Sequence, residues 1–314
     1  MRTGVTAVLP RDEAGNPQPV WAGQFTLNGN GEMTGTHWID DAGHLIGPIC
    51  ITNTHAIGAV HHGATQRMID HYADFFESHR GWAMPVVAET YDGMLTGINA
   101  LHVTPAHAIA AITSAKGGPV EEGSAGGGNG KIAYEFKAGT GTASRQVRLA
   151  GQNYRVGALV QANHGLRDWL TILGKPVGKL MTEDTWRKKR SRFDHCADRH
   201  RCAAVRPVAA PHRQTRRRRH RSRRHLVRQF LRRHLPGLLG RQPRPHAPRG
   251  AAFRDLHRPQ QRSTGPIYLA SVEAVEEAAV NAIVAGVDVA SVKPEGIMVR
   301  AIDTAKLAAL FRHA

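Results

Sequence analysis

The sequence predicts an α+β fold in which short strands and covering helices form one domain. Two observations lead to this expectation: apolar runs of strand length, separated by glycine-rich turns, fill the first half of the chain, and helical periodicity dominates residues 265–314. The composition is a further observation in its favour, because 314 residues that are 41% hydrophobic and 21% charged are typical of a globular protein. No stretch approaches the roughly 18 consecutive apolar residues of a membrane-spanning helix, so no membrane contact is expected.

The first elements follow from local patterns. Residues 20–40 contain short apolar runs separated by Asn28-Gly29 and Asn30-Gly31, a dipeptide that favours hairpin turns, so a hairpin is expected there. The apolar run in residues 47–60 is expected to form a buried strand, and the helical spacing of apolar residues in 61–79 predicts a helix.

The next elements alternate in type. Residues 84–95 predict a strand followed by a turn, and residues 104–115 predict a helix. The glycine-rich stretch 117–131 is followed by residues 131–165, whose apolar and polar residues alternate as in strands.

Two helices are expected at the end of the chain. Residues 266–286 predict an amphipathic helix that ends at Gly286, and residues 301–311 predict a final helix. The apolar residues expected to share one stripe of the longer helix are Leu269, Val272, Val275, Ala279, Val280 and Ile283.

The positive charge of the chain is concentrated in one segment. Residues 187–262 hold 25 of the 42 basic residues and three of the 25 acidic ones, so the remainder has 17 basic and 22 acidic residues. Of these 25 basic residues 23 are Arg, and the segment also holds eight of the 19 His and seven of the 17 Pro, without any periodicity. The expected organisation is therefore an N-terminal region of residues 1–186, an Arg-rich segment of residues 187–264 and a C-terminal helical region of residues 265–314.

Three interpretations of the Arg-rich segment compete. It is a nucleic-acid-binding segment acting through phosphate neutralisation, a solvated linker, or the product of translation in a shifted reading frame. Frame-shifted translation of G+C-rich DNA yields Arg, Pro, Ala, Gly and His, the residues that are abundant here.

General chemical motifs are weak. The stretch that ends at Lys131 departs from a P-loop, because Ala125 replaces the first Gly and Ile132 replaces Ser or Thr. The histidines near Cys50 lack the spacing of a zinc site. We therefore expect no metal and no cofactor. Three cysteines fit a reducing compartment, and a cytoplasmic location is expected because no secretory signal is visible.

Several blocks outside the Arg-rich segment resemble a known family. In chain order they are NGNGEMTGTHWI, ITNTHAIG, PVVAETYDG, GGGNGKIAYEFKAGTGTASR, VGALVQANHG and SVEAVEEAAVNA. They are similar to the P1-family serine aminopeptidases, the group of L-aminopeptidase/D-amidase-esterases and β-peptidyl aminopeptidases. The resemblance covers residues 1–183 and 265–314.

The resemblance implies a four-layer αββα sandwich similar to the N-terminal-nucleophile hydrolases, disrupted in the region 187–264. It also implies a homo-oligomer, a peptide, amide or ester substrate, and a precursor that cleaves itself before a Ser. That Ser becomes the nucleophile and the N-terminus of the second subunit. The family implies a further N-terminal segment before Met1, and a self-cleavage block of the type G-N-[GS]-S-G-D that this chain lacks.

The self-cleavage block can be recovered by back-translation. One choice of synonymous codons for residues 227–240, read one base later, gives S-G-N-S-S-G-D-I-F-L-A-F-S, in which the nucleophile codon straddles Leu231 and Arg232. Residues 192–206 similarly give G-S-I-I-V-L-I-A-T-D-A-P-L-F-V, an apolar strand and a turn. Both blocks fall in the same frame and in family order. We therefore expect a frame shift that begins between Trp186 and Ser191 and ends before Ile267, and nucleic-acid binding is the less favoured alternative.

The resemblance also implies site residues. Ser271 and Glu273 correspond to a Ser and a Glu that orient and tune the nucleophile, although a helix cap and a dipole-favoured acid would explain them as well. Glu122 corresponds to the carboxylate that meets the substrate ammonium, with Glu121 as its rival.

Two further residues correspond to the substrate pocket. Tyr134 matches a pocket tyrosine, or is a strand aromatic of the core, and Asn163 is a polar lining residue or a turn residue. Glu89 and Tyr91 belong to a family block without an assigned role.

Overall fold

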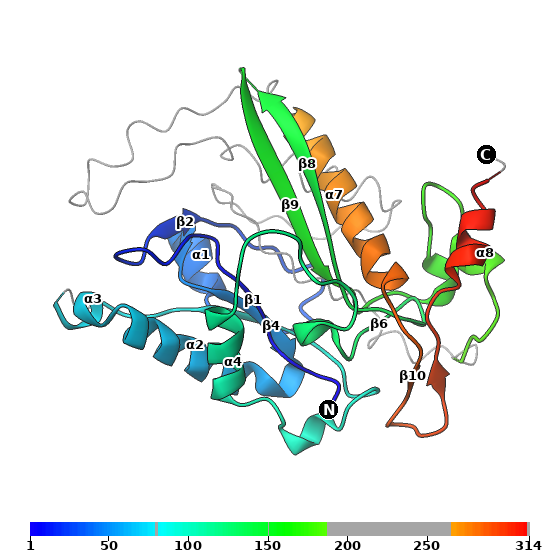
Figure 1. Cartoon of the computed structure of the whole chain (residues 1–314), viewed down its shortest axis with the longest axis horizontal. Helices are drawn as coiled ribbons and strands as arrows, with labels where there is room; N and C mark the ends of the chain where they lie inside the picture. Colours follow the sequence, from blue (N-terminus) through cyan, green and yellow to red (C-terminus); the bar gives the residue numbers. More distant parts are fainter. Residues whose placement is uncertain (79–80, 150, 187–264, 313–314) are drawn as a thin grey trace.

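The fold was determined as a computed structural model, which describes residues 1–78, 81–149, 151–186 and 265–312 (Figure 1). The expected features of the Arg-rich segment, including its two frame-restored blocks and the disruption of the fold there, lie outside the described residues. The boundaries 1–186, 187–264 and 265–314 stay a prediction.

The first sheet has the order β1-β4-β5. β4 (Ile49–Asn53) and β5 (Val86–Thr90) run parallel, and β1 (Thr6–Val8) pairs antiparallel with β4. Every residue of β4 and β5 is buried, which fits a parallel pair covered on both faces. The predictions of buried strands in 47–60 and 84–95 are confirmed.

Two helices cover one face of this sheet. α2 (Ile57–His71) and α4 (Pro105–Thr113) pack on each other and on β1, β4 and β5. Gly63 permits the close approach of these helices, because a Cβ there would lie 2.3 Å from the carbonyl oxygen of Pro105. The predicted helices in 61–79 and 104–115 are confirmed, and the short α3 (Ala73–Ser78) follows α2.

The second sheet is the long antiparallel ribbon of β8 (Thr140–Leu149) and β9 (Gln152–Gln161). α7 (Gly265–Val284) packs along it (Figure 1). The predicted helix is confirmed, and its predicted stripe is partly right. Leu269 is 55% exposed, whereas Ile283 is buried and Ala279 and Val280 pack against the core.

The residues of α7 that are buried are mostly small: Ile267, Ala270, Ser271, Ala274, Ala278, Ala282 and Ile283. Close packing explains this choice of face. A Cβ at Gly141 of β8 would lie 2.1 Å from the carbonyl oxygen of Ala278, so only an alanine-rich helix face fits against the ribbon.

The hairpin expected in residues 20–40 is wrong. β2 (Pro19–Trp21) pairs antiparallel with β3 (His44–Ile46), and α1 (Thr36–Ala42) lies between them. The stretch from Asn28 to Gly31 belongs to the loop before α1, in which the Asn28 side chain accepts a hydrogen bond from the backbone of Asn30. The Asn-Gly dipeptides therefore form local turns without pairing the strands beside them.

Smaller elements complete the described fold. They are the 3-10 turns η1 (Thr54–Ala56), η2 (Ile98–Ala100), η3 (Gly126–Gly128) and η4 (Arg167–Trp169), with β6 (Ile132–Ala133), β7 (Phe136–Lys137), α5 (Val177–Leu180), β10 (Val289–Ala290), β11 (Met298–Val299) and α8 (Thr304–Ala309). α8 confirms the predicted final helix.

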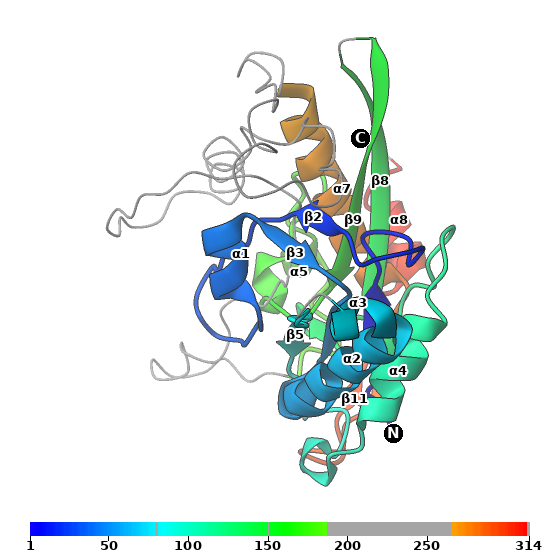
Figure 2. The ribbon, with the colours of Figure 1, turned by 90° about the vertical axis from the view of Figure 1, so that its left-hand side faces the viewer.

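The layers follow the order helix, sheet, sheet, helix, and α2 and α4 lie on the opposite side from α7 (Figures 1 and 2). The two sheets meet where Gln161 at the end of β9 donates a hydrogen bond to the hydroxyl of Thr6 in β1, over 2.7 Å. The backbone N–H of Gly127 donates to the same hydroxyl over 3.0 Å. The glycine-rich turn η3 is thereby held between the sheets.

Candidate functional site

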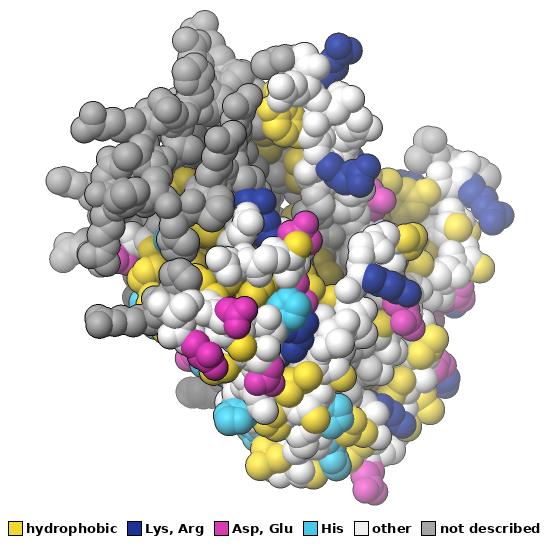
Figure 3. All heavy atoms as spheres, turned by 60° about the vertical axis from the view of Figure 1, so that its left-hand side comes forward, with side chains coloured by type: hydrophobic (Ala, Val, Ile, Leu, Met, Phe, Trp, Pro, Cys, Tyr) yellow, Lys and Arg dark blue, Asp and Glu magenta, His cyan; other side chains and the backbone are white. Residues whose placement is uncertain are grey.

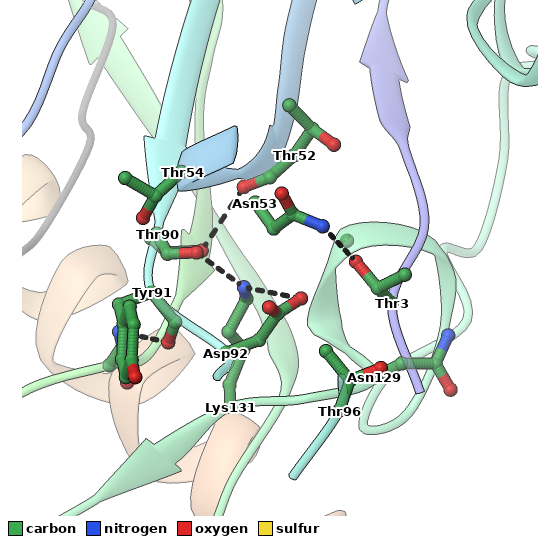
Figure 4. Close-up of polar contacts among 12 residues, drawn as sticks. Thr3, Thr52, Asn53, Thr54, Thr90, Tyr91, Asp92, Thr96, Asn129 and Lys131 are labelled. Carbon is green, nitrogen blue, oxygen red and sulfur yellow. Dashed lines mark hydrogen bonds and ion pairs between the residues drawn. The ribbon is translucent and has the colours of Figure 1, made fainter. Parts of the chain in front are cut away.

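A cluster of polar side chains lies at the carboxyl ends of β4 and β5. The register pairs Asn53 with Thr90 and Thr52 with Glu89, and all four are buried. Because parallel strands end at the same edge of a sheet, these residues lie together there, with neighbours along each strand pointing to opposite faces. Figure 4 shows Thr52, Asn53 and Thr90 at this edge. The carboxyl edge of such a pair is where open α/β sheets carry their ligands.

Hydrogen bonds order this cluster. Asn53 donates its side-chain amide to the hydroxyl of Thr3 over 2.8 Å (Figure 4). Thr54 donates its hydroxyl to the Glu89 carboxylate over 2.5 Å, so a buried carboxylate is held at the strand end.

A buried ion pair lies next to the cluster. Lys131 Nζ is 3.8 Å from a carboxylate oxygen of Asp92, and both side chains are fully buried. Lys131 also donates to the carbonyl of Thr90 over 2.9 Å. Burial raises the pKa of Asp92, and the nearby Lys131 charge opposes that rise.

Asn163, which follows β9, reaches the end of β5. Its side-chain amide donates to the backbone carbonyl of Tyr91 over 2.8 Å. The Tyr91 side chain is 46% exposed, and its ring lies over Gly93, where a Cβ would be 2.4 Å from the phenolic oxygen. Tyr91 therefore presents an exposed ring beside the buried polar cluster, and its backbone carbonyl binds the Asn163 amide.

Tyr134 and Glu135 adopt the left-handed backbone conformation, with φ of 52° and 66°. Arg167 compensates for this strained pair, because its buried guanidinium donates to the carbonyls of both residues. The Tyr134 N–H donates to the carbonyl of His164 over 2.8 Å, and the two rings meet edge to face. Tyr134 is thus fixed next to the Asn163 segment.

Glu122 lies at the edge of β8. Its Oε1 accepts both the N–H and the hydroxyl of Thr142, at 2.7 and 2.8 Å. Asn281 of α7 donates to the carbonyl of the same Thr142 over 2.9 Å, so Thr142 joins the glycine-rich stretch to α7. Glu121, the rival carboxylate, is exposed.

Ser271 and Glu273 point to different sides of α7. Ser271 is buried, and its hydroxyl donates to the carbonyl of Ile267 over 2.8 Å. Glu273 lies 3.3 Å from Arg145 Nε of β8, and Arg145 also pairs with Glu277. Two residues apart on a helix do not share a face, so these side chains do not contact each other.

Among the described residues, no group of three or more His, Cys, Asp or Glu side chains is arranged to hold a metal ion. No helix in the same ranges is both long and apolar enough to cross a membrane.

Comparison with known proteins agrees with this architecture. The model of peptidase family S58 matches residues 1–217, which is more than half of the chain. This chain belongs to peptidase family S58. The resemblance to the P1-family serine aminopeptidases is thereby confirmed.

Two relatives of this S58 chain are named beta-peptidyl aminopeptidase. The protein of Sphingosinicella microcystinivorans is 51% identical over 179 residues, and that of Sphingosinicella xenopeptidilytica is 44% identical over 178 residues. Each match covers 57% of this chain and 44% of the relative, so the matched region spans less than half the length of either relative.

Solved structures of similar proteins cover more of the chain. The L-aminopeptidase D-Ala-esterase/amidase of Ochrobactrum anthropi, described as a variant of the Ntn hydrolase fold, has a TM-score of 0.79 and 40% identity, covering 99% of this chain and 85% of that one. A Burkholderia beta-aminopeptidase has a TM-score of 0.72 and 34% identity, covering 100% and 87%. The predicted α+β sandwich of the Ntn hydrolase type is therefore confirmed.

The structure of this S58 chain groups the predicted site residues unevenly. Asn163 and Tyr134 lie in neighbouring segments through His164, whereas the contacts described for Glu122 are with Thr142 and those of Ser271 and Glu273 are on α7. The site roles of all five residues stay predictions.

Sequence reasoning gave no role to Glu89 and Tyr91, and did not single out Lys131 or Asp92 for a site. The signal that points to Glu89, Tyr91 and Asp92 is the abrupt change from apolar residues to Glu-Thr-Tyr-Asp at the end of β5.

Proposed function

We propose that this chain derives from a self-processing serine aminopeptidase, a hydrolase that releases N-terminal residues from peptides, amides or esters. The observation that carries the proposal is membership of the S58 family together with the polar cluster that Asn163 and Tyr91 close at the sheet ends. A peptide-like substrate, cytoplasmic location and homo-oligomeric assembly belong to the same proposal.

The chemistry requires a nucleophile that is also an N-terminus. A Ser hydroxyl at its ordinary pKa is a poor nucleophile and needs an adjacent base. A free α-amine, with a pKa of roughly 7.7–8.0, can accept the proton at neutral pH, and it exists only after the backbone has been cut. Self-cleavage before the Ser therefore generates the nucleophile and its base in one step.

Two other requirements fall on the described residues. The oxyanion of a tetrahedral intermediate needs fixed donors, and the Asn163 side-chain amide is held by the Tyr91 carbonyl at the end of β5. The substrate ammonium needs a carboxylate. Glu122 is the predicted one, with one oxygen bonded twice by Thr142. Glu89, buried at the end of β5 beside Tyr91, is a second candidate from the geometry.

The chain with its present sequence is proposed to be inactive, because the self-cleavage block is absent from it. The nucleotide sequence tests the frame-shift explanation directly. One inserted or deleted base near codons 186–191, and a compensating change before codon 267, are expected. A continuous frame with codons that cannot yield the family blocks would rule it out.

Expression of the chain provides a second test of inactivity. The chain should migrate as one uncut species and hydrolyse no aminoacyl p-nitroanilide. A chain in which the alternative frame is restored over residues 187–264 should cut itself into two fragments and hydrolyse these substrates. Two fragments and turnover from the unrestored chain would contradict the proposal.

A nucleic-acid-binding protein is the second candidate, favoured only by the density of Arg in residues 216–224. The rest of the chain carries more acidic than basic residues. Among the described residues on the face shown in Figure 3, acidic and basic side chains are interspersed. Steeply salt-dependent binding of the chain to single- or double-stranded oligonucleotides would support this candidate instead.

A further inference from the structure

Stability alone does not account for the buried pair of Lys131 and Asp92. Both side chains are fully buried, yet they are 3.8 Å apart, which is too long for a hydrogen bond between them. Removing two charges from water costs about as much as such a pair returns, so the pair contributes little net stability.

The contacts of Lys131 bracket a single residue. Its ammonium donates to the carbonyl of Thr90 and faces the carboxylate of Asp92, the two neighbours of Tyr91 in the chain (Figure 4). Asp92 also accepts, through its own carbonyl, the N–H groups of Leu95 and Thr96. The backbone on both sides of Tyr91 is therefore fixed from one point.

Gly130 makes this arrangement possible. A Cβ at Gly130 would lie 2.5 Å from the Cβ of Asp92, so the chain before Lys131 can approach Asp92 closely only because glycine is present. The glycine-rich stretch thus delivers Lys131 under the end of β5.

We propose that Lys131 and Asp92 are positioning residues, which hold the Tyr91 carbonyl in the orientation where it accepts the Asn163 amide. With residues 90 and 92 held, the carbonyl of Tyr91 faces Asn163, just beyond the end of β9, and the ring of Tyr91 stays at the surface. The orientation of Asn163 can be measured in a protein that has no activity. Whether this orientation affects substrate binding or turnover rests on the proposed function.

The test compares three variants of the full chain: Lys131→Met, Asp92→Asn, and the double variant that removes both charges. Each single change leaves one buried charge without its partner, so both should lower the thermal midpoint. The double variant should regain stability relative to the singles, because no unpaired buried charge remains. Stability and positioning are thereby separated.

Positioning is measured by NMR with selective ¹⁵N labelling of asparagine, the Asn163 side-chain signal being assigned by its loss in Asn163→Asp. In the double variant this signal should shift, and its hydrogen exchange should accelerate about tenfold as the bond to Tyr91 is lost. Lys137→Met is the matched control, since Lys137 is equally buried but bonds to Ser124 and Ala138. An unchanged Asn163 signal in the folded double variant, or an equal change in the control, would overturn the proposal.

Kinetics address the proposed function separately. In the frame-restored chain, the double variant should lower kcat for an aminoacyl p-nitroanilide while the control does not. If the Asn163 signal changes but kcat is unaffected, the positioning stands and the proposed catalytic role of Asn163 fails.

Discussion

The side-chain amide of Asn163 donates to the backbone carbonyl of Tyr91 over 2.8 Å, although 72 positions separate them in the chain. The contact joins the end of β9 to the end of β5, so each sheet of the sandwich contributes to one site. The geometry at this point depends on how the two sheets are packed, and local changes there are therefore informative.

Asn163→Asp should destabilise the protein by about 1 kcal/mol, because the donor is replaced by a carboxylate that faces the Tyr91 carbonyl. Urea unfolding at neutral pH measures the difference. Asn153→Asp in β9 is the control: the same substitution at an exposed position should stay within about 0.5 kcal/mol. Equal effects at the two positions would mean that the Asn163 contact is weak in solution.

The pH dependence of stability should reveal Lys137. Burial lowers the pKa of its ammonium to about 8 from the usual 10.5, and the Lys131 charge adds to the effect. The unfolded chain therefore holds this proton more tightly than the folded protein between pH 8 and 10.5. Below pH 8 the full cost of burying the charged ammonium opposes folding. The free energy of unfolding should therefore rise with pH between pH 8 and 10.5, by at most about 3 kcal/mol.

Lys137→Met should remove that rise, and the comparison is best made between pH 7 and 9. Burial raises the pKa of Cys50 to about 12, and this thiol acts in the opposite direction above pH 9. Parallel pH profiles for the two proteins, measured by urea unfolding, would show that Lys137 keeps an ordinary pKa.

Gly139 should be intolerant of any side chain. A Cβ there would lie 2.0 Å from the carbonyl oxygen of Gly123, whose backbone exchanges two hydrogen bonds with Thr140. Gly139→Ala should cost about 2–3 kcal/mol and loosen the stretch that carries Glu122. Gly157→Ala in β9, where a Cβ meets nothing within 4 Å, should change stability by less than about 0.5 kcal/mol. Chemical denaturation of both variants checks the contrast.

The sequence predicted the fold best where pattern and environment agree. The apolar runs that become β4 and β5 are buried on both faces, so burial alone identifies them. The stripe on α7 was predicted only in part, because the face in contact with the ribbon is selected by closeness of approach at Gly141, which favours Ala278 and Ala282 over larger residues. Alanine is less hydrophobic than valine or leucine, so a search for the most hydrophobic stripe passes over the alanine-rich face. Helical spacing alone could not decide which of two adjacent stripes contacts the ribbon.

The candidate site was predictable only in part for a similar reason. Asn163 was identified through its family block, but its partner Tyr91 is defined by a long-range contact that no local pattern contains. The buried pairing of Lys131 with Asp92 likewise depends on Gly130, whose role becomes visible only when the two segments are seen together.

Glu273 and Glu277 allow the predicted catalytic role of one carboxylate to be separated from its structural contact. Both bind Arg145 of β8, at 3.3 Å to Nε for Glu273 and 2.5 Å to Nη2 for Glu277, and both are about equally exposed. Glu277 raises the pKa of Arg145 more strongly, so it is the dominant partner of the ion pair.

In the frame-restored chain, Glu273→Gln should lower kcat for an aminoacyl p-nitroanilide by about 10²-fold if this carboxylate tunes the nucleophile. Glu277→Gln removes the stronger contact to Arg145 and should leave kcat unchanged. Equal losses in the two variants would assign the effect to the ion pair that ties α7 to β8, and Glu273 would then have no separate catalytic role.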